Sequence, residues 1–131
     1  MAKILLIDDD REMLRLEVAL LRMDGNQTNT IQPQESHPPT DVSSLQGYDL
    51  ILIDLIMPHR NGIQLLELIR KETNADTPAI ICTGRREGAP GVPIPPREEW
   101  AKRGILGILR KPFTPDELLT AVHMALNGKE T

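Results

Sequence analysis

The sequence predicts an α/β fold in which helices cover both faces of a parallel sheet. Four short aliphatic runs lack any alternation of polar and apolar side chains, and they occupy residues 4–7, 50–53, 79–82 and 105–109. Uninterrupted aliphatic strands are typical of parallel sheets that are buried on both faces. Segments with helical spacing lie between the runs, and this alternation favours right-handed crossovers.

Two of the segments between these runs predict amphipathic helices. In residues 11–23 the apolar positions lie three or four residues apart, at Met13, Leu16, Leu20 and Met23. The same spacing recurs at Ile63, Leu66 and Ile69. Apolar residues at this spacing share one side of a helix, and that side packs on the sheet.

The last predicted helix has the clearest boundaries. Thr114 suits the N-cap, Pro115 suits the first helical position, and Glu117 completes a capping box. An apolar-rich stretch follows over residues 118–126, and Gly128 then provides a natural stop. These signals together predict a helix from Pro115 to the residues just before Gly128.

Two stretches fit the alternating pattern poorly. Residues 26–44 are polar and hold three prolines, so we expect a weak edge strand near residues 28–32 and a short or irregular helix near residues 40–45. The segment GAPGVPIPP, residues 88–96, forbids a helix and leaves residues 97–103 to form one or two turns. We therefore expect the second and fourth helices of the fold to be irregular, shortened or displaced.

Length, charge and cysteine content exclude several classes of protein. The 131 residues match the usual size of one domain, and no linker or repeat divides them. Charges of both signs are mixed along the chain, and the net charge of −4 argues against direct nucleic-acid binding. Cys82 is the single cysteine, so the chain cannot form an internal disulfide. No apolar run approaches the roughly 20 residues that span a bilayer. We expect one cytoplasmic domain over residues 1–131, with no effector domain and no membrane contact.

Polar side chains stand where the four aliphatic runs end, in the order Asp8 and Asp9, Asp54, Thr83, and Lys111. Ligands of parallel sheets bind at the carboxyl ends of the strands, so these five side chains are expected in one crevice. Carboxylates gathered this closely need a cation, and oxygen ligands suit a hard ion such as Mg²⁺. The lysine adds a second positive charge, which suits a phosphoryl group, and one carboxylate could act as a nucleophile.

Around these positions the sequence resembles the receiver domain of bacterial two-component response regulators. The motifs LLIDDD, LILIDLIMPHRNG, IICTG and ILRKPF occur in the family's order, and the resemblance covers about residues 3–127. It implies a flavodoxin-like, doubly wound sheet of five parallel strands in the order 2-1-3-4-5. It also implies a phosphoacceptor module of a phosphorelay that changes protein–protein contacts. Such a module is not an enzyme in the usual sense, because it catalyses only its own phosphorylation and dephosphorylation.

The resemblance implies a metal site and a phosphoacceptor. Asp54 would accept a phosphoryl group from a sensor histidine kinase or a phosphotransfer protein. Asp9 and Asp54 would bind Mg²⁺, or Mn²⁺, through their side chains. Ile56 would bind the ion through its backbone carbonyl, and Asp8 would act through water.

Further residues would serve the phosphoryl group itself. Lys111 would pair with a phosphoryl oxygen, and with the phosphoacceptor before transfer, while Thr83 would hydrogen-bond the phosphoryl group. Gly84 would leave room for its approach, and Pro112 would follow the lysine through a cis peptide bond. The turn after the phosphoacceptor would be shaped by Pro58 and Gly62.

The sequence departs from the family pattern in its output region. Ile108 stands where the family usually has an aromatic residue, and the segment between Thr83 and Lys111 is several residues longer than usual. The phosphorylation chemistry is therefore expected to be intact, while the surface of the fourth helix, last strand and last helix is remodelled. A homodimer through the last strand and last helix is one expected assembly. Trp100 is expected to cover the core in preference to contacting a partner.

Two other functions remain as alternatives. A degenerate receiver would act as a binding module without phosphorylation, and Ile108 is the feature that favours it. A haloacid-dehalogenase-like phosphohydrolase would use Asp8 and Asp10, but Glu12 stands where that family expects threonine or valine. We expect Asp10 to cap the first helix instead.

Overall fold

The computed structural model describes residues 2–33, 45–58, 60–73, 75–84 and 94–128. Within them, one sheet of five parallel strands has the order β2-β1-β3-β4-β5. The strands are β1 (Lys3–Ile7), β2 (Gln27–Ile31), β3 (Leu50–Asp54), β4 (Ala79–Thr83) and β5 (Ile105–Arg110). This order and parallel pairing confirm the predicted flavodoxin-like, doubly wound fold, including a polar edge strand at β2.

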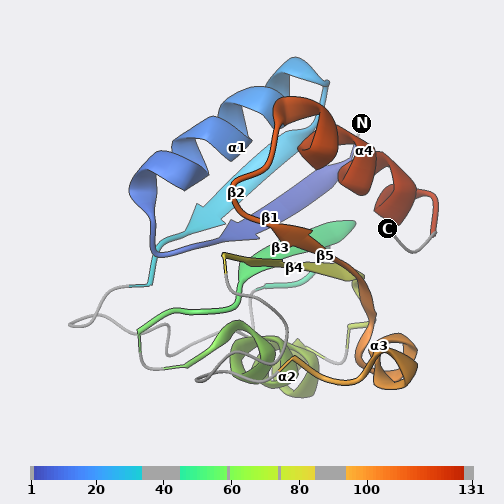
Figure 1. Ribbon diagram of the computed structural model, residues 1–131. Helices are drawn as coiled ribbons and strands as arrows, with labels where there is room; N and C mark the ends of the chain where they lie inside the picture. The colour runs from blue at the N-terminus through green and yellow to red at the C-terminus, as the bar shows by residue number, and fades with distance from the viewer. Residues whose placement is uncertain (1, 34–44, 59, 74, 85–93, 129–131) are drawn as a thin grey trace.

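Helices cover both faces of the sheet (Figure 1). One layer consists of α1 (Arg11–Met23) and α4 (Pro115–Leu126), and the other consists of α2 (Gly62–Thr73) and α3 (Arg97–Arg103). Because side chains alternate along a strand, Ile4 and Leu6 of β1 face the α1/α4 layer. Leu5 and Ile7 of the same strand face the α2/α3 layer. In the described part of the chain, no helix has the length and apolar character needed to span a membrane.

Helix α1 buries a different side from the one that the sequence indicated. Its buried residues are Leu14, Glu17 and Leu21. Two members of the predicted stripe lie largely in solvent, since Leu16 is 44% exposed and Met23 is 85% exposed. A second apolar row overlaps the first on this helix, and packing against the sheet decides which of the two is buried. The prediction of a helix over residues 11–23 is confirmed, but its apolar face was wrong.

Helix α4 has the boundaries that its capping residues predicted. The Thr114 hydroxyl accepts a hydrogen bond of 3.1 Å from the Glu117 amide, and the Glu117 carboxylate accepts one of 3.0 Å from the Thr114 amide. Gly128 follows the helix with a φ of +73°. Left-handed backbone of this kind favours glycine, so both ends of the helix are encoded locally.

The helix before β5 is short, in agreement with the proline-rich segment that precedes it. Helix α3 has seven residues and begins directly after Pro96, which supplies no side-chain cap. Trp100 is 6% exposed and packs in the core of the α2/α3 layer, and its indole Nε1 donates to the Pro95 carbonyl at 2.9 Å. The expected role of Trp100 as a cover over the core is confirmed. Residues 34–44 and 85–93, which include most of the segments predicted to be irregular, lie outside the described residues.

Candidate functional site

The carboxyl ends of the strands bring the predicted site residues together. Asp8 follows β1 and Asp54 ends β3, and these two strands pair through Ile7 and Ile53. Thr83 ends β4, and its carbonyl accepts a hydrogen bond of 2.8 Å from the backbone amide of Lys111. The parallel register therefore places four consecutive strand ends at one edge of the sheet.

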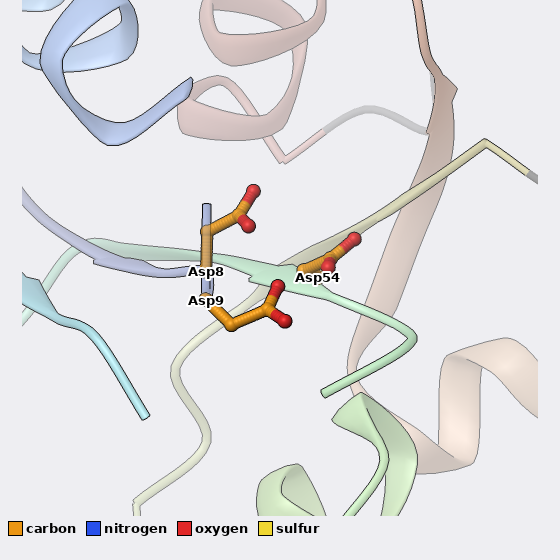
Figure 2. Close-up of side chains that lie close together, drawn as sticks. All are labelled: Asp8, Asp9 and Asp54. Carbon is orange, nitrogen blue, oxygen red and sulfur yellow. The ribbon is translucent and has the colours of Figure 1, made fainter. Parts of the chain in front are cut away.

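Three carboxylates converge at this edge. Asp8, Asp9 and Asp54 each offer an oxygen atom, and these atoms all lie within 4.8 Å of one another. Figure 2 shows the three side chains pointing toward a shared space from the ends of β1 and β3. Asp8 and Asp54 are buried, whereas Asp9 is exposed, so the cluster opens to solvent on one side.

Lys111 holds two of these carboxylates. Its Nζ atom lies 2.8 Å from Asp8 Oδ2 and 3.2 Å from Asp54 Oδ1. The predicted pairing of Lys111 with Asp54 is present, and the pairing with Asp8 is the shorter of the two. One ammonium group thus pairs with two members of a cluster of three carboxylates.

Burial and neighbouring charges shift the pKa values of Asp8, Asp54 and Lys111. Burial raises the pKa of Asp54 to about 6, and the neighbouring Asp8 carboxylate adds to the effect. Burial also raises the pKa of Asp8, against the opposing hydrogen bond from Lys111. Burial would lower the pKa of Lys111, but its hydrogen bond to Asp8 and the charge of Asp54 outweigh burial and raise it. The cluster carries more negative charge than the lysine neutralises, and a divalent cation would relieve it.

The three consecutive aspartates have separate structural roles. Asp10 is the N-cap of α1, and its side chain accepts hydrogen bonds from the Glu12 and Met13 amides at 3.0 and 3.3 Å. The Asp10 amide in turn donates to Asp8 Oδ1 at 2.8 Å. Asp8 is therefore held from both sides, by this amide and by Lys111, and the predicted helix-capping role of Asp10 is confirmed.

The turn after Asp54 depends on a glycine. The Gly62 amide donates to the Leu55 carbonyl at 2.8 Å, which brings the start of α2 against the chain that follows β3. A Cβ atom at Gly62 would lie inside van der Waals contact of the Asp54 carbonyl oxygen. No other residue fits without a shift of backbone, so the expected turn-forming role of Gly62 has a steric cause.

Other motif residues meet their expectations to different degrees. The Lys111–Pro112 peptide bond is cis, as predicted. An added Cβ at Gly84 would meet only Lys111 Cβ, at 3.9 Å, so the described structure does not itself demand glycine there.

The side chains near the ends of β4 and β5 differ in exposure. Thr83 is fully buried and Cys82 is 2% exposed, which confirms Cys82 as a small buried hydrophobe. Ile108, in place of the usual aromatic, is half-buried against the core of the α2/α3 layer.

Sequence reasoning missed Glu17, a carboxyl group beneath the site. Glu17 is 2% exposed on the sheet-facing side of α1. Burial raises its pKa to about 8, and the charges of Asp8 and Asp54 contribute in the same direction. The available signal was its position between Leu14 and Leu21, which mark the buried row, but this row was not the one chosen from the sequence.

These features define first a class and then a family. A doubly wound parallel sheet with a lysine and an acidic cluster at its carboxyl edge is the architecture of a flavodoxin-like signalling domain. A family model described as the response regulator receiver domain matches residues 4–123. The chain therefore belongs to the receiver domain family of two-component response regulators, as its motifs predicted.

Known relatives agree with this assignment. The nisin biosynthesis regulatory protein NisR of Lactococcus lactis is 36% identical over 133 residues, covering 98% of this chain and 52% of that protein. The transcriptional regulatory protein SpaR of Bacillus subtilis is 35% identical over 130 residues, covering 96% of this chain and 52% of its own length. The receiver domain of the Francisella response regulator 1452 superimposes with a TM-score of 0.73 at 28% identity, with 98% of each chain covered.

The family assignment sets the general function. Receiver domains are signalling modules and not classical enzymes, and they typically bind Mg²⁺ at an acidic pocket such as the one formed by Asp8, Asp9 and Asp54. The chain spans about half the length of the transcriptional regulators that it matches. The family match, together with Asp10 acting as a helix cap, removes the basis for the phosphohydrolase alternative.

Proposed function

We propose that Asp54 is the phosphoacceptor of this receiver domain. The observation that carries the proposal is the ion pair between Lys111 Nζ and Asp54 Oδ1, at 3.2 Å, inside a cluster of three carboxylates. In the transfer, an Asp54 oxygen attacks phosphorus while the bond from phosphorus to the donor breaks. The donor is the phosphohistidine of a sensor histidine kinase or phosphotransfer protein, whose ring nitrogen leaves with the bonding electrons.

The same cluster suits a divalent cation. Its donors are carboxylate oxygens, and one lysine pairs with two of the three carboxylates, so such an ion would neutralise charge that the lysine leaves. Burial, with a contribution from the neighbouring carboxylates, raises the pKa of Asp8 and Asp54 and adds to this need. Asp9, Asp54 and the Ile56 carbonyl would hold Mg²⁺ or Mn²⁺, with Asp8 acting through water. When bound, the ion neutralises charge on the phosphoryl oxygens.

The remaining residues position the transferred group. Lys111 is already oriented by two carboxylates and would pair with a phosphoryl oxygen once Asp54 is modified. Thr83 would donate its hydroxyl hydrogen to another phosphoryl oxygen and draw the β4 end inward. Its backbone carbonyl accepts a hydrogen bond of 2.8 Å from the Lys111 amide, which keeps the two residues side by side.

We further propose that phosphorylation changes protein contacts at the face formed by β5 and α4. A groove of about 380 Å³ lies between them and includes Ile108 and Met124. A homodimer through this face is one expected assembly, and any DNA binding would belong to another domain, as in transcriptional regulators. The domain would act in the cytoplasm, where its donors are found.

The test is chemical phosphorylation followed by intact-mass measurement. The protein is incubated with Mg²⁺ and acetyl phosphate, and one added phosphoryl group is expected. Asp54→Asn should abolish the adduct, whereas Asp116→Asn, which removes an exposed carboxylate on α4, should retain it. An adduct that persists in Asp54→Asn would refute the assignment of the phosphoacceptor. Absence of any adduct in the natural sequence would favour the degenerate receiver, the alternative that Ile108 supports.

A further inference from the structure

A groove runs between helix α1 and the edge strand β2, on the side of α1 away from α4. Its volume is about 420 Å³, and we call it the α1–β2 groove. Its lining combines exposed arginines of α1 with aliphatic and polar side chains of both elements: Arg11, Leu14, Arg15, Val18, Ala19, Arg22, Thr30 and Gln32. None of these residues takes part in the phosphorylation chemistry proposed above.

The groove is basic in an acidic protein. Arg11, Arg15 and Arg22 are all exposed, and the described lining holds no aspartate or glutamate. Within the described part of the chain, Arg15 pairs with the exposed Glu12, at 3.7 Å, and Arg22 Nε donates to the Thr28 hydroxyl at 3.1 Å. An exposed ion pair of that length neutralises little charge. Since the chain as a whole carries −4, this face is a local reversal of sign.

The second wall of the groove is the edge strand of the described sheet. Strand β2 is the outermost strand and, among the described residues, pairs only with β1. Thr28 and Thr30 point toward α1, as the bond from Arg22 and the groove lining show. Unpaired strand edges accept an added strand, and alternate side chains of that strand would then lie beneath α1.

We propose that the α1–β2 groove binds an extended acidic segment of a partner protein, which adds a strand beside β2 and places alternate carboxylates against Arg11, Arg15 and Arg22. The spacing of Arg11 and Arg15 fits, because residues four apart on a helix are separated by about 6 Å along its axis, and Arg22 lies about 10 Å beyond Arg15, within reach of a later carboxylate. Side chains two apart on one side of a strand are separated by about 7 Å. The aliphatic floor at Leu14 and Val18 would cover apolar stems of the added strand.

Charge near one end of the groove selects against a nucleic acid. The Gln32 amide donates to the Asp9 carbonyl at 3.4 Å, so the groove ends beside the carboxylate cluster. A long polyanion that followed the arginines would run into this cluster and be repelled. A short peptide with carboxylates only at alternate positions ends before it.

The test uses peptides of defined pattern and amide chemical shifts of the ¹⁵N-labelled protein. The probe is a peptide that alternates glutamate and valine, compared with a scrambled peptide of equal composition and with a lysine–valine counterpart. We expect the alternating acidic peptide to shift the β2 amides and to bind more tightly than the other two. Equal binding of the scrambled peptide, or no shift at β2 at millimolar concentration, would overturn the proposal.

Charge reversal on α1 separates this site from general electrostatic attraction. Arg11→Glu with Arg15→Glu should weaken binding about tenfold or more, since two attractive contacts become repulsive. The matched control reverses two exposed lysines on the other layer, Lys71→Glu and Lys102→Glu, with the same change in net charge. Equal weakening in both variants would refute the groove as the site, as would a DNA duplex that outcompetes the peptide. All four positions are exposed, so both variants should fold.

Discussion

The two helical layers of this domain bury different kinds of side chain. In the α2/α3 layer the buried core residues are aliphatic apart from Trp100, and charged groups such as Glu67 and Arg103 stay at the rim. In the α1/α4 layer an aliphatic core of similar make-up surrounds Glu17, which is 2% exposed. The core of one layer is therefore apolar, while the core of the other contains a carboxyl group that is unfavourable there when ionised.

The difference follows from the position of the site. The charges that act on Glu17 are those of Asp8, Lys111, Asp54 and Asp10, all of which belong to the carboxyl edge of the sheet or the first turn of α1. The α1/α4 layer thus shares its electrostatics with the phosphorylation site. The buried core described for the α2/α3 layer holds no titratable side chain, so its stability should depend on shape and not on protonation.

Truncation of Trp100 should have the largest effect on stability. Trp100→Ala removes the largest side chain of the α2/α3 core and should lower the free energy of unfolding by about 3–5 kcal/mol. Trp100→Phe retains most of the packing but loses the hydrogen bond to Pro95, so it should cost about 1–2 kcal/mol. Urea unfolding measures both. A loss in Trp100→Ala below that of Trp100→Phe would contradict the assignment of Trp100 to the core.

The α1/α4 layer should instead respond to pH. The folded protein holds a proton on Glu17 up to about pH 8, whereas the unfolded chain loses it near the ordinary pKa of 4.5. Unfolding therefore releases a proton in this interval, and stability should fall as pH rises from about 5 to 8, by a few kcal/mol. Asp54, with a pKa raised to about 6, adds a fall of the same sign at the acidic end of the interval.

Two substitutions isolate the contribution of Glu17. Glu17→Gln should flatten the pH dependence above about pH 7, where Asp54 is largely ionised in both states. Glu17→Leu should do the same and also raise stability at pH 8, because it replaces a buried carboxyl with an aliphatic side chain. The measurement is urea unfolding in the presence of a chelator. An unchanged pH profile in both variants would show that another group titrates.

Much of this comparison follows from sequence, but not all of it. The five strand-end residues could be predicted, because aliphatic runs are local signals that the parallel register then brings together. The strand order was implied by the resemblance to receiver domains. Asp10 and Thr114 were equally readable, since a cap acts within one turn of its helix. The buried side of α1 could not be predicted from the sequence, because two apolar rows overlap on this helix and only tertiary packing selects one of them. Glu17 was missed for that reason alone.

Arg70, at the rim of the α2/α3 layer, is a position where we expect a smaller loss of stability than at Trp100. Arg70 donates to the Arg103, Ala75 and Gly104 carbonyls at 3.0, 3.1 and 3.4 Å, and so ties the end of α2 to the end of α3. Arg70→Met keeps the aliphatic stem but removes the donor to the Arg103 and Ala75 carbonyls, whereas the Gly104 carbonyl still accepts from the Ala79 amide at 2.8 Å. The substitution should lower the free energy of unfolding by about 1–2 kcal/mol.

The matched control is Arg103→Met, on the neighbouring helix. Arg103 pairs with Glu67 and Glu99, whose side chains are largely exposed, so its loss should cost about 0.5 kcal/mol or less. Both variants remove one positive charge from the same rim, and urea unfolding compares them directly. If Arg70→Met and Arg103→Met lowered the free energy of unfolding equally, ion pairs and not hydrogen bonds to the backbone would hold α3 in place. The stability of this short helix would then decrease as the salt concentration rises.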